Sequence, residues 1–223
     1  MTNELLFILM TMISLTFVML AFRLGKTWLI ALIAINAVLM NIFAMKGMYL
    51  FGFAATGGNI MYASIFLAAD LLNEYYNKKE ARRAVMIGFF GSIFFLITTQ
   101  LILRFIPADY DVAQKSFTIL FTLAPRIVIG SMVAYLISQN LDVWIFSKIK
   151  KFTGGKHLWL RNNASTWTSQ LVDSIIFSTI AFAGVYPLFE LIAFTYIIKV
   201  LIATIDTPFI YLSKKIKPEE LNI

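Results

Sequence analysis

Two stretches of the sequence carry the same polar pattern within a chain that is 60% hydrophobic. They read SQNLDVWIF, from Ser138 to Phe146, and SQLVDSIIF, from Ser169 to Phe177. A carboxylate beside a primary amide can accept two N–H hydrogen bonds and can also donate one to a carbonyl. This combination matches the polar edge of a guanine-like heterocycle, so the stretches indicate a site for a small polar solute. The residues concerned are Gln139, Asp142, Gln170 and Asp173.

Other polar and aromatic side chains recur at helical spacing around these stretches. Three successive segments present them at intervals of mostly three or four positions, which places them on one face of a helix. Serine and threonine would be enough to join helices by hydrogen bonds, whereas an ionised side chain at the bilayer centre costs at least about 2.5–3.5 kcal/mol. The faces therefore favour a solute cavity over simple helix contacts. They comprise Ser131, Tyr135, Ser138 and Asp142; Thr166, Ser169, Gln170, Asp173 and Phe177; and Tyr196, Lys199 and Asp206.

The composition predicts a protein of the lipid bilayer. Only 14% of the 223 residues are charged, against about 25% in a typical soluble domain, and the mean hydropathy is +0.80. Apolar runs of about 20 residues match the thickness of the hydrocarbon core. We predict one all-α domain over residues 1–223, a polytopic bundle of seven transmembrane helices. The apolar segments are 4–22, 27–45, 48–71, 84–106, 117–147, 165–186 and 188–212.

The same composition argues against several function classes. The chain has no cysteine and one histidine, His157, so thiol catalysis and Cys-built or His-built metal sites are not expected. Paired aspartates on neighbouring helices could form a protease-like dyad, which is the least favoured alternative. We predict no enzyme activity, no metal and no cofactor. The basic residues lie in short loops, so nucleic acid is not an expected partner, and no signal for an oligomeric state is present.

The distribution of basic residues predicts the orientation in the membrane. With the N-terminus outside and the C-terminus inside, most of the 19 basic residues fall in cytoplasmic loops and the tail, as the positive-inside rule requires. The opposite loops hold only Lys46, Arg104 and Lys115, together with two aspartates. We therefore predict seven spans, N-out and C-in. Six spans and a re-entrant segment are the alternative.

Two of the apolar segments look irregular. FGFAATGGNIMYAS, residues 51–64, places three glycines beside Asn59; a broken helix lining a binding site and tight packing of a continuous helix are equally compatible with it. The segment 117–147 is too long for one span and contains Pro125, so we expect a short lead-in and a main helix that starts near this proline.

The ionisable residues inside the apolar segments differ in depth. Asp70 and Asp142 lie near predicted cytoplasmic ends, where a cap or loop anchor is a serious alternative to a substrate role. Asp173 and Lys199 lie closer to the middle of their spans, where function is favoured. Arg126 falls just after Pro125. We expect Arg126 and Lys199 to neutralise buried carboxylates or to gate the cavity.

Several ordered strings resemble the queuosine precursor transporter family, a vitamin-uptake family similar to the substrate-binding components of ECF transporters. They are DLLNEYYNKKEAR from Asp70, PRI…S…AY.ISQ.LD from Pro125, GKHLWLRNNAST…Q..D...F from Gly155, and Y..K……TP from Tyr196. The resemblance runs from about Asn36 to the C-terminus. Residues 1–25 are expected to form an additional helix before a core at 26–223. One departure is Asn77, where the family more often has glycine.

The resemblance implies import of a 7-deazaguanine, such as the cyano precursor (preQ0) or aminomethyl precursor (preQ1) of queuosine, across the plasma membrane. The alternative is an ECF-type binding subunit that needs a separate energising module. Such subunits dock through stripes of small residues, to which Ala31, Ala34 and Ala37 are a poor match. The expected partners are a deazapurine and the bilayer. The expected substrate-binding residues are Asn59, Asp70, Arg126, Tyr135, Gln139, Asp142, Gln170, Asp173, Phe177, Tyr196 and Lys199.

The two S-Q-x-x-D stretches are not expected to be equivalent. On consecutive spans they run in opposite directions, with Asp142 near the cytoplasmic end and Asp173 about 15 Å into the next span. We predict that Gln170 and Asp173 bind the heterocycle edge, while Tyr135, Phe177 and Tyr196 stack on it. The first stretch is predicted to form the wall or cytoplasmic gate of the same cavity.

Overall fold

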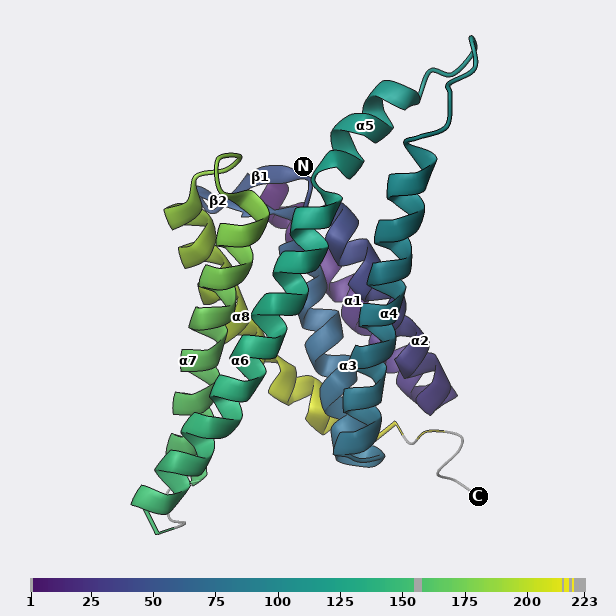
Figure 1. Cartoon of the computed structure of the whole chain (residues 1–223). Helices are drawn as coiled ribbons and strands as arrows, with labels where there is room; N and C mark the ends of the chain where they lie inside the picture. The colour runs from purple at the N-terminus through teal and green to yellow at the C-terminus, as the bar shows by residue number, and fades with distance from the viewer. Residues whose placement is uncertain (1, 155–157, 214, 217, 219–223) are drawn as a thin grey trace.

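The fold is a bundle of long helices that run in alternate directions between its two ends (Figure 1). The computed structural model describes residues 2–154, 158–213, 215, 216 and 218. The expectation of an all-α membrane bundle holds in outline, with one small β-hairpin added. Within the described residues the helices are α1 (Asn3–Leu24), α2 (Lys26–Phe43), α3 (Tyr62–Tyr75), α4 (Lys78–Ile102), α5 (Gln114–Thr122), α6 (Ala124–Phe152), α7 (Leu158–Phe182) and α8 (Leu188–Ser213).

Six of the seven expected segments coincide with a long helix, and the third does not. Residues 47–56 form an antiparallel hairpin of β1 (Gly47–Leu50) and β2 (Phe53–Thr56), followed by the 3-10 helix η1 (Gly57–Met61) and then α3. With 14 residues, α3 is about 21 Å long, shorter than the hydrocarbon core of about 30 Å. The glycine-rich stretch is thus a break in the helical structure before α3.

The division of the segment 117–147 is confirmed. Helix α5 ends at Thr122, and α6 begins at Ala124 with Pro125 in its first turn. A proline is tolerated there because the first N–H groups of a helix have no partner within it.

Four described helical segments are long and apolar enough to cross a bilayer: Asn3–Leu24, Lys26–Phe43, Lys79–Ile102 and Gln114–Asp142. The protein is a multi-pass membrane protein. The seven-span, N-out and C-in topology stays a prediction, and the alternate helix directions agree with it (Figure 1). The hairpin lies at one end of the bundle, and the turns between α1 and α2 and between α3 and α4 lie at the other.

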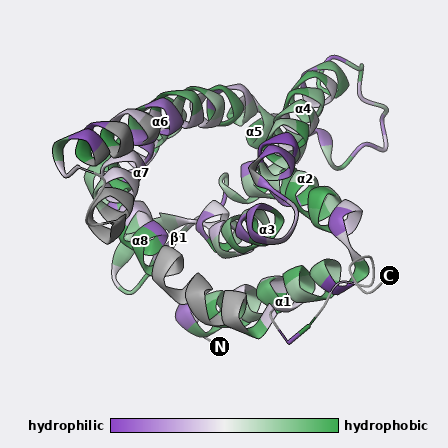
Figure 2. Cartoon of the chain, turned by 90° about the horizontal axis from the view of Figure 1, so that it is seen from below, coloured by the Kyte–Doolittle hydropathy of each residue, from purple (hydrophilic) through white to green (hydrophobic). Residues whose placement is uncertain are grey.

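Helix α3 lies in the middle of the bundle, as the view along the helices shows (Figure 2). It contacts α1, α2, α4 and α8, and its apolar side chains, such as Leu67 and Leu71, are fully buried with Phe22 and Leu29. Large apolar side chains on the outer helices, among them Phe90 on α4, remain exposed. This distribution suits a protein whose exterior contacts lipid tails instead of water.

Helices α6 and α7 form an antiparallel pair that is closely packed along its length. Their most extensive contacts are with each other, and α7 also packs against α8. Contacts from α6 to α2 and α4 are fewer. The pair therefore forms one wall of the bundle, joined to the central α3 through α8.

The hairpin is held in place by the helices that flank it. Phe51 and Gly52 form its turn with φ angles of 51° and 81°, as two-residue hairpin turns require. The Phe51 N–H donates to Glu4 of α1 over 3.1 Å, and the Ala54 N–H donates to Glu190 of α8 over 3.3 Å. Both acids lie in the first turn of their helix. These bonds fix the start of η1 relative to α1 and α8.

The departure from the family pattern at Asn77 also has a structural explanation. Asn77 has a φ of 150°, a region that favours glycine. Its side-chain oxygen accepts the Glu80 N–H over 3.0 Å and caps α4. Asn77 adopts a backbone conformation that glycine adopts more easily, and its side chain adds a hydrogen bond that caps α4.

Substituting Gly57 by alanine is expected to lower the free energy of unfolding by about 1–3 kcal/mol. A Cβ atom at Gly57 would lie 2.8 Å from the backbone oxygen of Phe43 in α2, and main chain cannot move aside as a flexible side chain could. Thermal unfolding in detergent measures the effect. Gly91→Ala is the control, because its Cβ would meet Val38 at an ordinary 3.6 Å. Equal stability of the two variants would contradict the expectation.

Candidate binding site between helices α3, α6, α7 and α8

A buried ion pair lies at the junction of α7 and α8. Lys199, which is 2% exposed, pairs with the Oδ2 atom of Asp173. The other oxygen of Asp173 accepts a hydrogen bond of 3.2 Å from the Ser138 hydroxyl on α6. The Asp173 side chain is 18% exposed, so it is less enclosed than Lys199. Both ions lie near the middle of their helices, where an unpaired charge would be most costly.

Tyr62, the first residue of α3, forms the other wall around Lys199. The Lys199 ammonium lies 4.8 Å from the centre of the Tyr62 ring, which is a cation–π distance. The ring stacks on Phe66 with 5.9 Å between centroids. Tyr62 was not expected from the sequence. The available signal was the glycine-rich stretch just before this residue. A helix that starts there, inside the bundle, places its first side chain against the core.

Asn59 extends the polar arrangement by one turn toward the hairpin. Its side-chain oxygen lies 3.4 Å from the Thr195 hydroxyl of α8, which donates to it. Thr195 and Lys199 are four residues apart on α8, and Asn59 and Tyr62 are three apart on the chain, so the two pairs lie on adjacent turns. We use the name polar centre for Asn59, Tyr62, Ser138, Asp173, Thr195 and Lys199.

The repeated S-Q-x-x-D pattern forms a reciprocal contact between α6 and α7. Ser138 of the first stretch donates to Asp173 of the second, and Ser169 of the second donates to Asp142 of the first, each over 3.2 Å. Antiparallel helices produce this symmetry because a serine and an aspartate four residues apart lie one turn apart on the same face. The two halves differ in ion pairing: Asp173 pairs with Lys199, and Asp142 has no ion-pair partner among the described side chains.

Arg126 lies at a different place from the polar centre. Its Nε and Nη2 atoms donate to the backbone oxygens of Ile180 and Ala183, over 3.1 and 2.9 Å. These carbonyls belong to the last turn of α7 and its exit, where carbonyl groups lack partners within the helix. A cation there also complements the helix dipole. The contacts indicate that Arg126 caps α7, and its expected substrate role stays a prediction.

Arg126→Met is expected to lower the free energy of unfolding by about 2–3 kcal/mol, because two charge-assisted hydrogen bonds are lost. The affinity of the folded protein for its solute should not change. Thermal unfolding and equilibrium binding on the same sample separate the two effects. Exposed Arg104→Met serves as the control. Weaker solute binding at unchanged thermal stability would instead place Arg126 at the solute.

The remaining expected residues are spread around the bundle. The Tyr135 ring packs edge-on against Phe89 of α4, with 4.9 Å between centroids, and Phe177 packs edge-on against Phe182. Each of these two rings therefore has an aromatic partner within the bundle. Gln139 and Asp70 are exposed, and Gln170 and Tyr196 are half-buried. His157 and the side chains of Arg161, Asn162 and Asp206 lie outside the described part of the structure.

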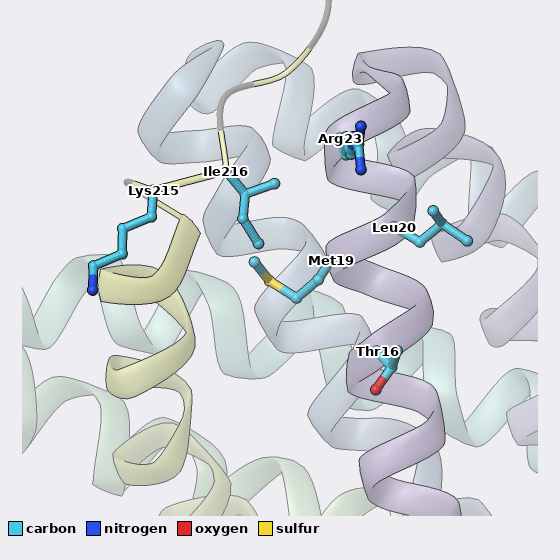
Figure 3. Close-up of a pocket in the computed structure, with 6 residues that line it drawn as sticks. All are labelled: Thr16, Met19, Leu20, Arg23, Lys215 and Ile216. Atoms are coloured by element: carbon cyan, nitrogen blue, oxygen red, sulfur yellow. The ribbon is translucent and has the colours of Figure 1, made fainter.

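A surface hollow lies elsewhere, between α1 and the chain that follows α8 (Figure 3). It is lined by Thr16, Met19, Leu20 and Arg23 from α1 and by Lys215 and Ile216. This place is beyond the last turn of α8, whereas Lys199 lies near the middle of that helix. Among the described residues, no group of three or more His, Cys, Asp or Glu side chains could hold a metal ion. The polar centre therefore remains the best candidate for solute recognition.

Comparison with known proteins decides the family. Residues 56–213, from the end of β2 to the end of α8, match the family model described as "Putative vitamin uptake transporter". The chain belongs to this family. The match contains every residue of the polar centre, so these residues lie in the region that the chain shares with other vitamin uptake transporters.

Three curated relatives have names that specify a solute. The chain is 40% identical to a "Probable queuosine precursor transporter" of Bacillus subtilis (strain 168), over 88% of this chain and 87% of the relative. It is 26% identical to a protein of the same name from Haemophilus influenzae, over 59% of this chain and 54% of the relative. It is 30% identical to the "Queuosine precursor transporter" of Escherichia coli (strain K12), over 59% and 57%. No solved structure matches the chain.

Proposed function

We propose that this vitamin uptake transporter imports a queuosine precursor, a 7-deazaguanine such as preQ0 or preQ1, across the plasma membrane into the cytoplasm. The buried Asp173–Lys199 pair carries the proposal, because charged side chains in the middle of a bilayer are costly and mark substrate or ion pathways. The names of three relatives support the substrate.

The proposed binding step uses the partly exposed Asp173 side chain. A guanine-like ring presents neighbouring N–H donors, and an ionised carboxylate accepts two of them. Ser138 and Lys199 hold the carboxylate in position, so little ordering is needed when the ring arrives. Lys199 also neutralises the carboxylate. The charges of Asp173 and Lys199 therefore compensate each other, and a neutral ring does not change the net charge of the site.

Uptake in living cells tests the proposal. The protein is expressed in a strain that cannot make its own precursor, and queuosine in tRNA is measured at low external precursor. Restored queuosine is expected with the native chain and not with an equally expressed Asp173→Asn variant. If the native chain never restores queuosine, the proposed substrate is wrong.

The alternative of an energised ECF-type binding subunit finds less support in the structure. A Cβ atom at Gly88 of α4 would meet the Ala37 Cβ at 3.1 Å and the Ala34 Cα at 3.9 Å. Two of the three small residues of α2 therefore pack against α4 and are half-buried, which leaves less of this stripe available to dock an external module. Purified chain in liposomes provides the test: uptake without any other protein would exclude dependence on a module.

A further inference from the structure

Three asparagines are buried in the described part of the bundle, and they differ in how their amides are satisfied. The Asn36 Nδ2 donates to Ser64 over 3.0 Å. The Asn41 Nδ2 donates to the Ala37 oxygen over 3.0 Å and contacts the Ser92 hydroxyl at 3.1 Å. The Asn59 Nδ2 has no partner among the described residues, although Asn59 is only 2% exposed. Buried donors in folded proteins nearly always have a partner, so the unmatched amide of Asn59 needs an explanation.

The unpaired Asn59 amide nitrogen lies close to the ion pair of Asp173 and Lys199. Thr195 bonds the oxygen end of the Asn59 amide, which leaves the nitrogen end directed elsewhere. The Asn59–Thr195 contact and the contact of Tyr62 with Lys199 lie on adjacent turns. One turn of helix is about 5.4 Å along the axis, which is the scale of one planar heterocycle. A single ring could therefore reach both the amide and the carboxylate.

The backbone around Asn59 is fixed, so the donor is presented in a defined position. Asn59 lies in η1, where Gly57 and Gly58 pack directly on the end of α2. The hairpin that precedes η1 is bonded to α1 and α8 through Glu4 and Glu190. A donor held in this way costs little ordering entropy when it binds a ligand.

We propose that the Asn59 amide nitrogen donates a hydrogen bond to a carbonyl oxygen of the transported ring, while Asp173 accepts N–H groups of the same ring. The proposal rests on the proposed function, since the ring is the transported solute. It defines the ligand class as a planar heterocycle with a carbonyl acceptor next to N–H donors. It also assigns the carbonyl contact to Asn59 instead of Gln170, the amide expected from the sequence to work with Asp173.

The test combines two ligands with two proteins. Binding of preQ0 and of its 6-thioxo counterpart, which keeps the ring N–H donors but replaces the carbonyl oxygen with sulfur, a weak acceptor, is measured by calorimetry on purified protein. The native chain should bind the oxygen compound on the order of tenfold more tightly. Asn59→Ala should lose this preference by weakening the oxygen compound and leaving the sulfur compound nearly unchanged. A preference of native size in Asn59→Ala overturns the inference.

Two further variants keep the test decisive. Asn36→Ala removes a buried amide whose donor is satisfied, so it should lower stability and keep the oxygen preference. Thr195→Val removes the bond that orients Asn59 without removing its amide, and it should reduce the preference partly. If Asn59→Ala does not fold, an unchanged preference in Thr195→Val overturns the inference. A native chain that binds neither compound contradicts the proposed substrate itself, whereas native binding with an unaltered preference in the variants contradicts only the role of Asn59.

Discussion

Replacing Lys199 by methionine is expected to lower the free energy of unfolding by about 3–5 kcal/mol, because removing one partner of a buried ion pair leaves the other charge uncompensated. Methionine fills a similar volume, so the loss comes mainly from the stranded Asp173 carboxylate and the lost contact with the Tyr62 ring. Thermal unfolding in detergent measures the change. The exposed Lys115→Met is the matched control, and its effect should stay within about 0.5 kcal/mol.

The double variant Lys199→Met with Asp173→Asn is expected to recover much of the lost stability. Its asparagine is neutral and can still accept the Ser138 hydrogen bond. Uptake by the double variant should be as low as in Asp173→Asn alone, because the proposed N–H acceptor is missing. A double variant that is no more stable than Lys199→Met would show that charge compensation is not what Lys199 provides.

Asp173→Asn and Asp142→Asn are expected to affect uptake very differently, although their sequence contexts match. Asp173→Asn should reduce uptake on the order of 100-fold, because a neutral amide cannot replace an ionised acceptor for two N–H groups. Asp142→Asn should stay within about threefold of the native rate, since asparagine can keep the bond from Ser169. Initial rates of radiolabelled precursor uptake, divided by the amount of folded protein in the membrane, measure both.

Each substitution removes one charge from the same pair of helices, and Asp173→Asn also leaves Lys199 without its partner, so both rates are divided by the amount of folded protein. Normal membrane insertion is expected for both variants. Equal losses of uptake would contradict the assignment of different roles to the two stretches. Loss in Asp142→Asn alone would move the solute site toward the C-terminal end of α6.

The sequence predicted well those features that depend on local composition. Apolar runs of membrane length identified the long helices, and Pro125 marked the start of α6 because its missing N–H is harmless only in a first turn. Helical spacing placed Ser138 and Asp142 on one face and Ser169 and Asp173 on another. A lysine near mid-span also had to have a partner, which is why Lys199 was expected to neutralise a carboxylate.

The segment 48–71 shows where such reasoning failed. Its residues are mostly apolar, so hydropathy could not separate a helix from a short hairpin followed by η1 and α3. The hairpin depends on bonds to Glu4 and Glu190, which lie far away in the chain. For the same reason Tyr62 was missed, since its role arises only where α3 meets α8.

The sequence by itself determined that the chain lies in a bilayer, that most of its apolar segments are helical, and which polar side chains need a partner or a ligand there. The tertiary structure decided which group each of these polar side chains contacts. It placed Lys199 against Asp173 but Arg126 against the carbonyls at the end of α7. It also made the repeated pattern a reciprocal contact, because antiparallel packing brings each serine opposite the other stretch's aspartate. Helical periodicity defines the face on which a side chain lies, and only packing between helices determines what that face meets.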